Sequence, residues 1–561
     1  MKVRDFDNEG SSDDELQHGA LKKVWDETIK SDDLLLFRWP HSTVALYTLH
    51  PQPLDIFRLW QIYLDNVNPL LKVTHTPTLQ ARILSAAGDI INIAPELEAL
   101  MFSIYSMAIF SLSEESCYGI FASSKSSLLA AYQMGCQQAL VNCNFLRTTS
   151  RDCLTALYLY LISIRDKATP QSLSSMLSAA IRIAQRIGIH NESTLSKVAP
   201  LEAEMCRRLW WCLVIFDARI GEMADIRATS LLPIWDCKLP LNVNDSDLRE
   251  DMKEHPQMQG IWTEALFAVV RSELGDALRT ARHHLGTYAP SLNIGYTGNP
   301  VTEVGQTHLI ERHFEEKYLG RCDSGNPLHF MTIWFTRGLI AKLRLMEHHF
   351  QYSGSPLHQA EGQRAAAVSY ALTMLKANTM LVTSPLTQGF RWMVNQYFPL
   401  IAYIQTLQYV KSHPSTPKAA EGWIIMSENH QAHGNIFQMP PGLGFYKILA
   451  NLVLQAWDAH AASTYGNSPS AEAPPIVVSM RQRMAAMAKQ RMLSSEAVDG
   501  NEGPARTDLG TDFSASTATD PGFHQNFNNS APNDGYMLQE WASYADLVDL
   551  QPENLPAASY V

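Results

Sequence analysis

Hydrophobic residues recur three and four positions apart through most of the middle of this chain. The first clear case follows Pro53, and the spacing predicts a helix that ends before the Asn68-Pro69 step, because the residue preceding a proline disfavours helical geometry. The apolar positions of this helix are Ile56, Leu59, Trp60, Tyr63, Leu64 and Val67. Such spacing gathers the apolar side chains on one face, which then packs against a core.

The same periodicity predicts a series of further helices. Before residue 200 the expected ranges are 97–112, 125–141, 153–164 and 173–187, with Gly188 where the last helix should end. After residue 220 the expected ranges are 260–282, 333–349, 364–383, 389–409 and 444–460. We find no run of alternating β-branched residues bounded by hairpin turns, and no fixed repeat period. The sequence therefore predicts an all-α fold: one large irregular multi-helix domain with disordered N- and C-terminal tails.

Composition divides the 561 residues into three parts. Residues 1–50 are acidic and poor in apolar positions, so we expect them to be mostly disordered. Residues 51–465 carry the helical pattern. Residues 466–561 begin as a linker, continue with a short basic helix striped with methionine, and end in an acidic tail.

The most unusual segment is Glu202–Asp217, where acidic residues are followed by two arginines, two tryptophans and a long apolar run. Glu204 precedes Arg207 and Arg208 by three and four residues, the spacing at which opposite charges pair on a helix. Residues 209–216 are apolar all round a helix, so other elements must surround them. We interpret the segment as a central structural helix with a charged collar, in preference to a catalytic or ligand-binding role. The residues of this motif are Glu204, Arg207, Arg208, Trp210, Trp211 and Asp217.

Charge, hydropathy and cysteine content narrow the class of protein. A formal net charge of −12 argues against a broad surface for nucleic acid. We expect no apolar stretch long enough to span a membrane, and the polar N-terminus does not resemble a signal peptide. Eight cysteines without framework spacing indicate a reducing compartment, the cytosol or the nucleus.

The sequence offers little support for a metal site or a catalytic site. His430 and His433, like the adjacent histidine pairs at 283–284 and 348–349, have no further ligands at zinc spacing. The acidic runs at 13–15 and 32–33 lie in the N-terminal segment, whereas a helical cyclase would hold magnesium inside a helical cavity. Nucleophile-elbow, Walker and dinucleotide motifs are missing from the sequence. We therefore expect no enzyme, no catalytic residue, and no metal or cofactor site.

Several segments in the right order resemble the fungal-specific transcription factor domain, the middle homology region of fungal zinc-cluster transcription factors. Glu202–Asp217 resembles the acidic–Met–Arg-Arg-Leu-Trp-Trp run of that family. Residues 184–190 are similar to its Gly-Leu-His-like step, and residues 238–247 to its Leu-Pro-Asn-Asp segment. Residues 57–69 and 75–78 look like its first helix and loop. The resemblance covers residues 51–248 and implies an all-α regulatory domain.

The chain departs from that family near its N-terminus. The family carries six cysteines there, which bind two zinc ions and present a helix to DNA, whereas the first cysteine here is Cys117. Residues 1–33 hold ten acidic and five basic residues, so this end should repel DNA. Zinc, which the resemblance implies, would lack its ligands in this sequence. DNA contact is therefore expected only indirectly, from a zinc-cluster partner or from a missing N-terminal exon.

The acidic tail gives a second functional indication. After Arg506 it holds eight acidic residues and no lysine or arginine. Acidic segments with large apolar side chains are typical of regions that bind coactivator grooves, although a solvated tail has the same composition. The expected activation anchors, on one face if the segment is helical, are Trp541, Tyr544, Leu547 and Val548.

Together with the resemblance, these features predict a nuclear transcriptional regulator of a metabolic gene cluster, including clusters for secondary metabolites. Its tail would contact the transcription machinery or a coactivator, and its body would pair with a second copy or a zinc-cluster protein, away from any membrane. An apolar pocket near Trp210, Trp211 and Trp235 is a hypothesis for metabolite sensing. The alternative is a helical metabolite-binding or enzymatic accessory protein of a biosynthetic pathway, without a direct role in transcription.

Overall fold

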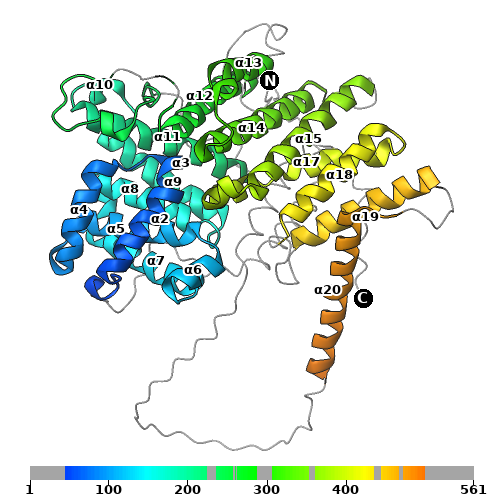
Figure 1. Ribbon diagram of the computed structural model, residues 1–561, viewed down its shortest axis with the longest axis horizontal. Coiled ribbons are helices and arrows are strands. Elements are labelled where there is room, and N and C mark those ends of the chain that lie inside the picture. The colour runs from blue at the N-terminus through cyan, green and yellow to red at the C-terminus, as the bar shows by residue number, and fades with distance from the viewer. Residues whose placement is uncertain are drawn as a thin grey trace, which may run out of the picture.

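The computed structural model of the chain describes its helical body. Helices make up this body and no strand occurs among the described residues, so the predicted all-α fold is confirmed there (Figure 1). The described residues are 45–223, 235–256, 260, 262–286, 306–352, 361–434, 444–465 and 472–499.

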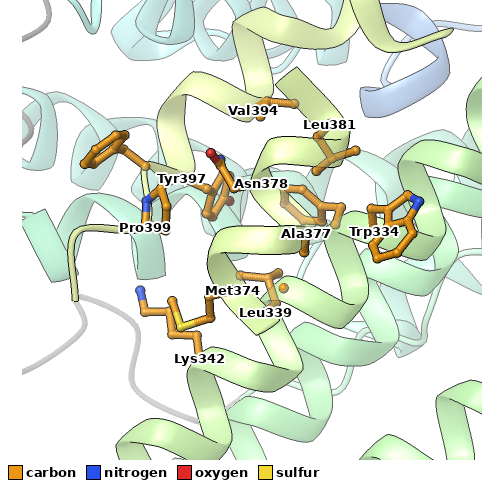
Figure 2. Close-up of a pocket in the computed structure, with 13 residues that line it drawn as sticks. Trp334, Leu339, Lys342, Met374, Ala377, Asn378, Leu381, Val394, Tyr397 and Pro399 are labelled. Carbon is orange, nitrogen blue, oxygen red and sulfur yellow. The ribbon is translucent and has the colours of Figure 1, made fainter. Parts of the chain in front are cut away.

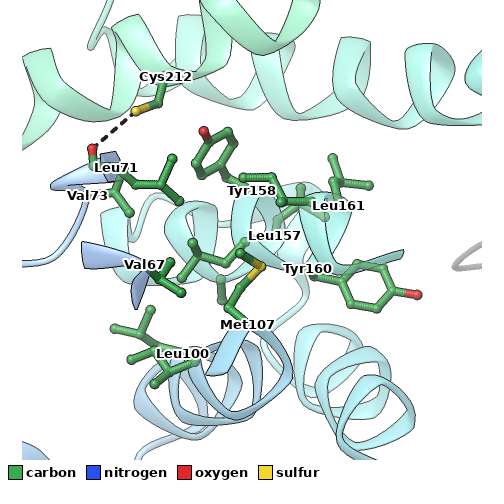
Figure 3. Close-up of a cluster of buried hydrophobic side chains, with 14 of the residues drawn as sticks. Val67, Leu71, Val73, Leu100, Met107, Leu157, Tyr158, Tyr160, Leu161 and Cys212 are labelled. Atoms are coloured by element: carbon green, nitrogen blue, oxygen red, sulfur yellow. Dashed lines mark hydrogen bonds between the residues drawn. The ribbon is translucent and has the colours of Figure 1, made fainter. Parts of the chain in front are cut away.

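The N-terminal half is a bundle arranged around one central helix, α5. Its helices are α2 (Pro53–Asn66), α3 (Asn68–Leu71), α4 (Thr76–Gly88), α5 (Pro95–Ser111), α6 (Glu114–Phe121), α7 (Lys125–Asn142), α8 (Arg151–Ile164), α9 (Pro170–Ile187), α10 (Glu192–Leu195) and α11 (Pro200–Met223). Every residue from Ala99 to Ser111 is buried, because α2, α7 and α8 pack around α5. Figure 3 shows Leu100 and Met107 in the cluster that also takes in Val67 and Tyr158.

At two glycines, any side chain would raise the energy of the folded state. A Cβ on Gly135 of α7 would lie 2.6 Å from the Phe102 ring of α5, so this glycine allows the two helices to approach closely. Gly188 ends α9 in the left-handed region, with φ of +89°, and its N–H donates to the carbonyl groups of Ala184 and Gln185. Glycine adopts that conformation without a steric penalty, as the sequence predicts for this position.

The C-terminal half contains a second core. Its helices are α12 (Leu266–Gly286), α13 (Gln306–Lys317), α14 (Pro327–Tyr352), α15 (Glu361–Thr383), α16 (Arg391–Val394), α17 (Leu400–Ser412), α18 (Pro417–Ala432), α19 (Gly444–Tyr465) and α20 (Pro475–Asp499). Helix α15 packs against α14, α17 and α18, and α20 packs against α18 and α19. The buried side chains of Val477 and Met480 belong to this core. The first turns of α20 therefore pack on this core.

The sequence predicts a single helix over residues 389–409, and this prediction is wrong. The chain forms a short 3-10 helix at Pro385–Phe390, then α16, another 3-10 turn, and α17 from Leu400. Pro399 explains the break, because it lacks an N–H and disfavours helical geometry at Phe398, whose ψ is 131°. The 3-10 turn and the break bring Tyr397 and Phe398 against α14 and α15.

The expectation of no stretch long enough for a membrane also needs correction. Residues 362–383, within α15, are long and apolar enough to span one by length and composition. More than half of the matching window is buried inside the protein, against α14, α17 and α18. A core helix surrounded by other helices satisfies the same criteria, because burial in protein also favours apolar residues on all sides.

Candidate functional site

The motif helix α11 is largely enclosed by other helices. It packs against α8, α9 and α12, and most of its residues are buried. Its apolar run is surrounded by other helices, as expected for a helix that is apolar all round. The six motif residues are all buried: Glu204, Arg207, Arg208, Trp210, Trp211 and Asp217.

A chain of buried ion pairs begins at the first turns of α11. Arg208 donates from Nε to Glu204 Oε1 at 2.9 Å and from Nη1 to Asp245 Oδ1 at 2.8 Å. The Lys72 ammonium lies 3.0 Å from Asp245 Oδ2 and 3.0 Å from Glu264 Oε2. Four of these five side chains are at most 3% exposed, Glu264 being the exception. We call these five residues the buried charge network.

Asp245 is the residue through which distant segments meet. It begins the 3-10 helix Asp245–Asp247, which precedes α12, and its backbone carbonyl accepts a hydrogen bond from His75 Nε2 at 2.9 Å. Its carboxylate also accepts from the N–H of Thr76, the first residue of α4. A negative charge at this end of a helix is favourable because the helix dipole is positive there. The network therefore joins α3, α4, α11 and the start of α12.

A second, more exposed branch starts at Arg207. Its guanidinium hydrogen-bonds to both carboxylate oxygens of Glu192 on α10. The same carboxylate accepts from the backbone N–H of Lys238 at 3.2 Å. Burial raises the pKa of Glu192, but the hydrogen bonds from Arg207 and Lys238 outweigh burial and lower it. This branch ties α10 and the segment after residue 235 to the motif helix.

Burial and ion pairing act differently on the two buried carboxylates of the network. Burial would raise the pKa of Asp245, yet Lys72 and Arg208 hold it well below its usual range. Burial raises the pKa of the Glu204 carboxyl, a change that Arg208 and the Leu241 N–H only partly offset. Both carboxylates are closed off from solvent and occupied by these partners. A substrate has no route to the oxygens of these two carboxylates. The arrangement is therefore suited to holding segments of the chain together.

The tryptophans of the motif pack against each other and against a third. The ring of Trp235 meets Trp210 at 5.5 Å and Trp211 at 5.1 Å, both nearly edge to face. Trp211 Nε1 donates to the carbonyl of Lys238 at 2.9 Å. The three indoles thus pack against one another at the place that the pocket hypothesis assigns to a metabolite. Aromatic rings in this geometry attract one another through edge and face charges of opposite sign.

The far end of α11 makes contacts that sequence reasoning missed. Arg219 donates from Nε to the carbonyl of Gln396 at 3.1 Å, and Glu222 Oε2 lies 3.1 Å from the Lys342 ammonium of α14. Asp217, the last motif residue, lies more than two turns from the buried charge network. No local spacing predicts these pairings, nor those of Lys72, because the partners are far apart along the chain.

A small cavity lies between α14, α15 and the turn before α17. Its volume is about 50 Å³, and its lining is mostly apolar, with Lys342 and Asn378 as polar groups (Figure 2). Asn378 Oδ1 is occupied by hydrogen bonds from Asn429 and from His433 Nε2. A cavity of this size accommodates a few waters, whereas ligand pockets begin at roughly 300 Å³.

His430 and His433, two of the histidines considered as metal ligands, are engaged in hydrogen bonds. His430 Nε2 lies 3.0 Å from the Ser479 hydroxyl of α20, and His433 faces Asn378. Within the described ranges, no group of three or more His, Cys, Asp or Glu side chains is placed to hold a metal ion. The predicted activation anchors Trp541, Tyr544, Leu547 and Val548 lie outside the described residues.

Comparison with known proteins identifies the family to which the motif helix and its partners belong. Residues 60–256, which contain the motif helix, Lys72 and Asp245, match the family described as the fungal specific transcription factor domain. The chain is 49% identical to the transcriptional regulator AacuB of Aspergillus aculeatus, over 84% of this chain and 65% of that protein. It is 45% identical to the transcriptional regulator nsrM of Aspergillus novofumigatus, over 85% of this chain and 66% of that protein.

A more distant relative is matched over a larger share of its own length. The aurofusarin cluster transcription factor aurR2 of Gibberella zeae is 30% identical over 85% of this chain and 71% of that protein. The chain thus spans about two thirds of the length of these curated relatives. The matches extend well beyond the motif helix and cover most of the helical body. The chain belongs to the family of proteins with a fungal specific transcription factor domain.

Proposed function

We propose that this protein is a transcriptional regulator of a fungal biosynthetic gene cluster, one that makes a secondary metabolite. The observation that carries the proposal is the 49% identity, over 84% of the chain, to a protein named as a transcriptional regulator. Other relatives are named as transcription factors of the aurofusarin cluster and of the pyriculol/pyriculariol biosynthesis cluster. The protein would act in the nucleus and would catalyse no reaction.

In this proposal the helical body is a regulatory platform. The buried charge network and the Trp210–Trp211–Trp235 cluster hold α3, α4 and the segment after residue 235 to α11. A rigid body of this kind suits pairing with a second copy or with a zinc-cluster protein, which would supply the contact to DNA. The six motif residues would then act as architecture, with no direct role in binding DNA or a ligand.

Residues 507–561 would recruit a coactivator or the transcription machinery. The proposed anchors are Trp541, Tyr544, Leu547 and Val548, surrounded by acidic residues and by no lysine or arginine. Such a segment stays soluble through its charge and uses the large apolar side chains to bind a groove. Its test is a fusion of residues 507–561 to an unrelated DNA-binding domain in front of a reporter gene. We expect reporter expression that is lost when the four anchors become alanine, and a silent fusion would refute the activation role.

The role of the whole protein is tested by transcript levels. Deleting the gene should lower the transcripts of neighbouring biosynthetic genes together, and the intact gene should restore them. Unchanged transcripts with loss of a metabolite would instead indicate an accessory protein of the pathway. A purified chain that captures a zinc-cluster protein, and that shows no salt-dependent binding to the promoter alone, would support indirect contact with DNA.

A further inference from the structure

A cleft lies between the end of α18 and the first turns of α20. The two helices pack against each other (Figure 1), and the cleft between them has a volume of about 450 Å³. Ligand pockets cover roughly 300–1,000 Å³, so this cleft has room for a small molecule, unlike the cavity beside Tyr397. Its lining includes His430, Gln431 and Gly434 on one side, and Ser479, Gln482 and Arg483 on the other.

The two sides of the cleft are fixed by contacts that need no ligand. His430 Nε2 lies 3.0 Å from the Ser479 hydroxyl, and this contact joins α18 to α20. Met480, the next residue of α20, is fully buried in the second core. At the end of α18, His433 Nε2 lies 2.6 Å from Asn378 Oδ1 of α15. The cleft is therefore preformed, as most small-molecule sites are.

The cleft carries one full charge, and that charge is positive. Arg483 contributes it, and none of the described residues that line the cleft is acidic. Burial, reinforced by the Arg483 charge, lowers the pKa of His430 to about 4, so the imidazole is neutral at pH 7. The amides of Gln431 and Gln482 and the hydroxyl of Ser479 are uncharged polar groups. The lining therefore favours an anion that also carries groups able to form hydrogen bonds.

Arg481, two positions before Arg483 on α20, has different surroundings. It donates from Nη2 to Asp458 Oδ1 of α19 at 3.2 Å, and 51% of its side chain is exposed. The two arginines therefore face different neighbours, because Arg481 pairs with α19 whereas Arg483 lines the cleft against α18. Removing either arginine changes the charge of α20 equally, which makes Arg481 a matched control for Arg483.

We propose that this cleft binds a small polar molecule through a carboxylate, which pairs with the guanidinium of Arg483. A planar guanidinium matches the two oxygens of a carboxylate, and the opposite charges strengthen each hydrogen bond between them. A phosphate monoester carries about 1.5–2 negative charges at pH 7, so a single arginine neutralises a carboxylate more fully. Hydroxyl groups of the ligand would form hydrogen bonds with Gln431, Gln482 and Ser479.

Such a ligand would bridge two helices of the second core. Its carboxylate would hold α20 through Arg483, and its other polar groups would reach Gln431 near the end of α18. A ligand that binds only the folded chain stabilises that chain by mass action. The cleft lies outside residues 60–256, the range that matches the family, and the inference does not depend on the proposed role in transcription.

Isothermal titration calorimetry on the full chain, with the monocarboxylates gluconate and 4-hydroxybenzoate, tests the proposal. Each is compared with its uncharged amide, gluconamide or 4-hydroxybenzamide, which keeps the rest of the molecule. We expect saturable binding of at least one carboxylate, with a dissociation constant on the order of 1 mM or below, and no binding of its amide. Glucose 6-phosphate should bind more weakly than that carboxylate.

Variants locate the bound carboxylate. Arg483→Gln should weaken binding about tenfold or more, whereas Arg481→Gln should leave binding unchanged. Gln482→Glu, at an exposed position, should also weaken binding, because it places a negative charge beside the ligand. Far-ultraviolet circular dichroism checks that each variant keeps its helices.

Three results would overturn the proposal: neither carboxylate binds, an amide or glucose 6-phosphate binds as tightly as the carboxylate, or Arg483→Gln binds like the wild type. A peptide of residues 536–550 distinguishes a second source of carboxylates, the acidic tail of the chain itself. Saturable binding of this peptide, without binding of gluconate or 4-hydroxybenzoate, would assign the cleft to the tail and would refute a small-molecule site.

Discussion

Replacing Arg208 with methionine should destabilise the body far more than the loss of a surface ion pair. The Arg208 guanidinium is buried between the carboxylates of Glu204 and Asp245, at 2.9 and 2.8 Å. Methionine fills a similar volume but leaves both negative charges without this partner. Breaking a buried ion pair by removing one member costs about 3–5 kcal/mol, and we expect that loss in the free energy of unfolding.

Urea denaturation at neutral pH, followed by far-ultraviolet circular dichroism, measures this loss. The matched control is Arg58→Met, because Arg58 pairs with Asp55 at 3.0 Å on the surface, with 47% of its side chain exposed. An exposed pair contributes roughly 0–1 kcal/mol. The double variant Arg208→Met with Glu204→Gln should recover part of the loss, because one buried charge is then removed while the acceptor for the Leu241 N–H remains.

The pH dependence of the loss gives a further check. Without Arg208, the raised pKa of Glu204 should rise further above its unfolded value, so folding of the variant favours the protonated carboxyl. That contribution is present at low pH and is lost as the pH rises through the folded pKa. The difference in the free energy of unfolding between wild type and Arg208→Met should therefore become smaller from pH 7 towards pH 5. Equal losses for Arg208→Met and Arg58→Met, or a difference that does not change with pH, would refute the argument.

Three other substitutions follow from the structure. Gly135→Ala should cost about 1–3 kcal/mol by thermal melting, because the new Cβ would meet the Phe102 ring. Gly188→Ala should cost about 1 kcal/mol in urea denaturation, since φ of +89° strains any side chain and the Cβ would lie 2.9 Å from Thr194. Burial lowers the pKa of His433 to about 3, so the unfolded chain binds a proton at this histidine more readily than the folded chain does. The free energy of unfolding should therefore fall as the pH drops below about 6.5, by up to roughly 1.4 kcal/mol per pH unit. His433→Gln should flatten that slope in denaturation curves measured from pH 7 to 4, and an unchanged slope would contradict the assignment.

The helices were largely predictable because their signals are local. The range expected at 125–141 is α7, Lys125–Asn142, and the range expected at 153–164 lies within α8. The pairing of Glu204 with Arg208 also follows from four-residue spacing alone. The one long error, at 389–409, arose because the helical spacing of apolar residues continues across Pro399, where the backbone cannot continue a helix.

The all-α class, most helix positions and the buried character of α11 follow from the amino-acid sequence alone. These properties depend on residues a few positions apart, whose interactions are set by helix geometry. The charges around Arg208 depend instead on long-range contacts: Lys72 and Asp245 are 173 positions apart and meet at 3.0 Å. The packing of Trp235 on the motif tryptophans is a contact of the same kind. Such contacts depend on how the whole chain folds back on itself, which local periodicity cannot encode.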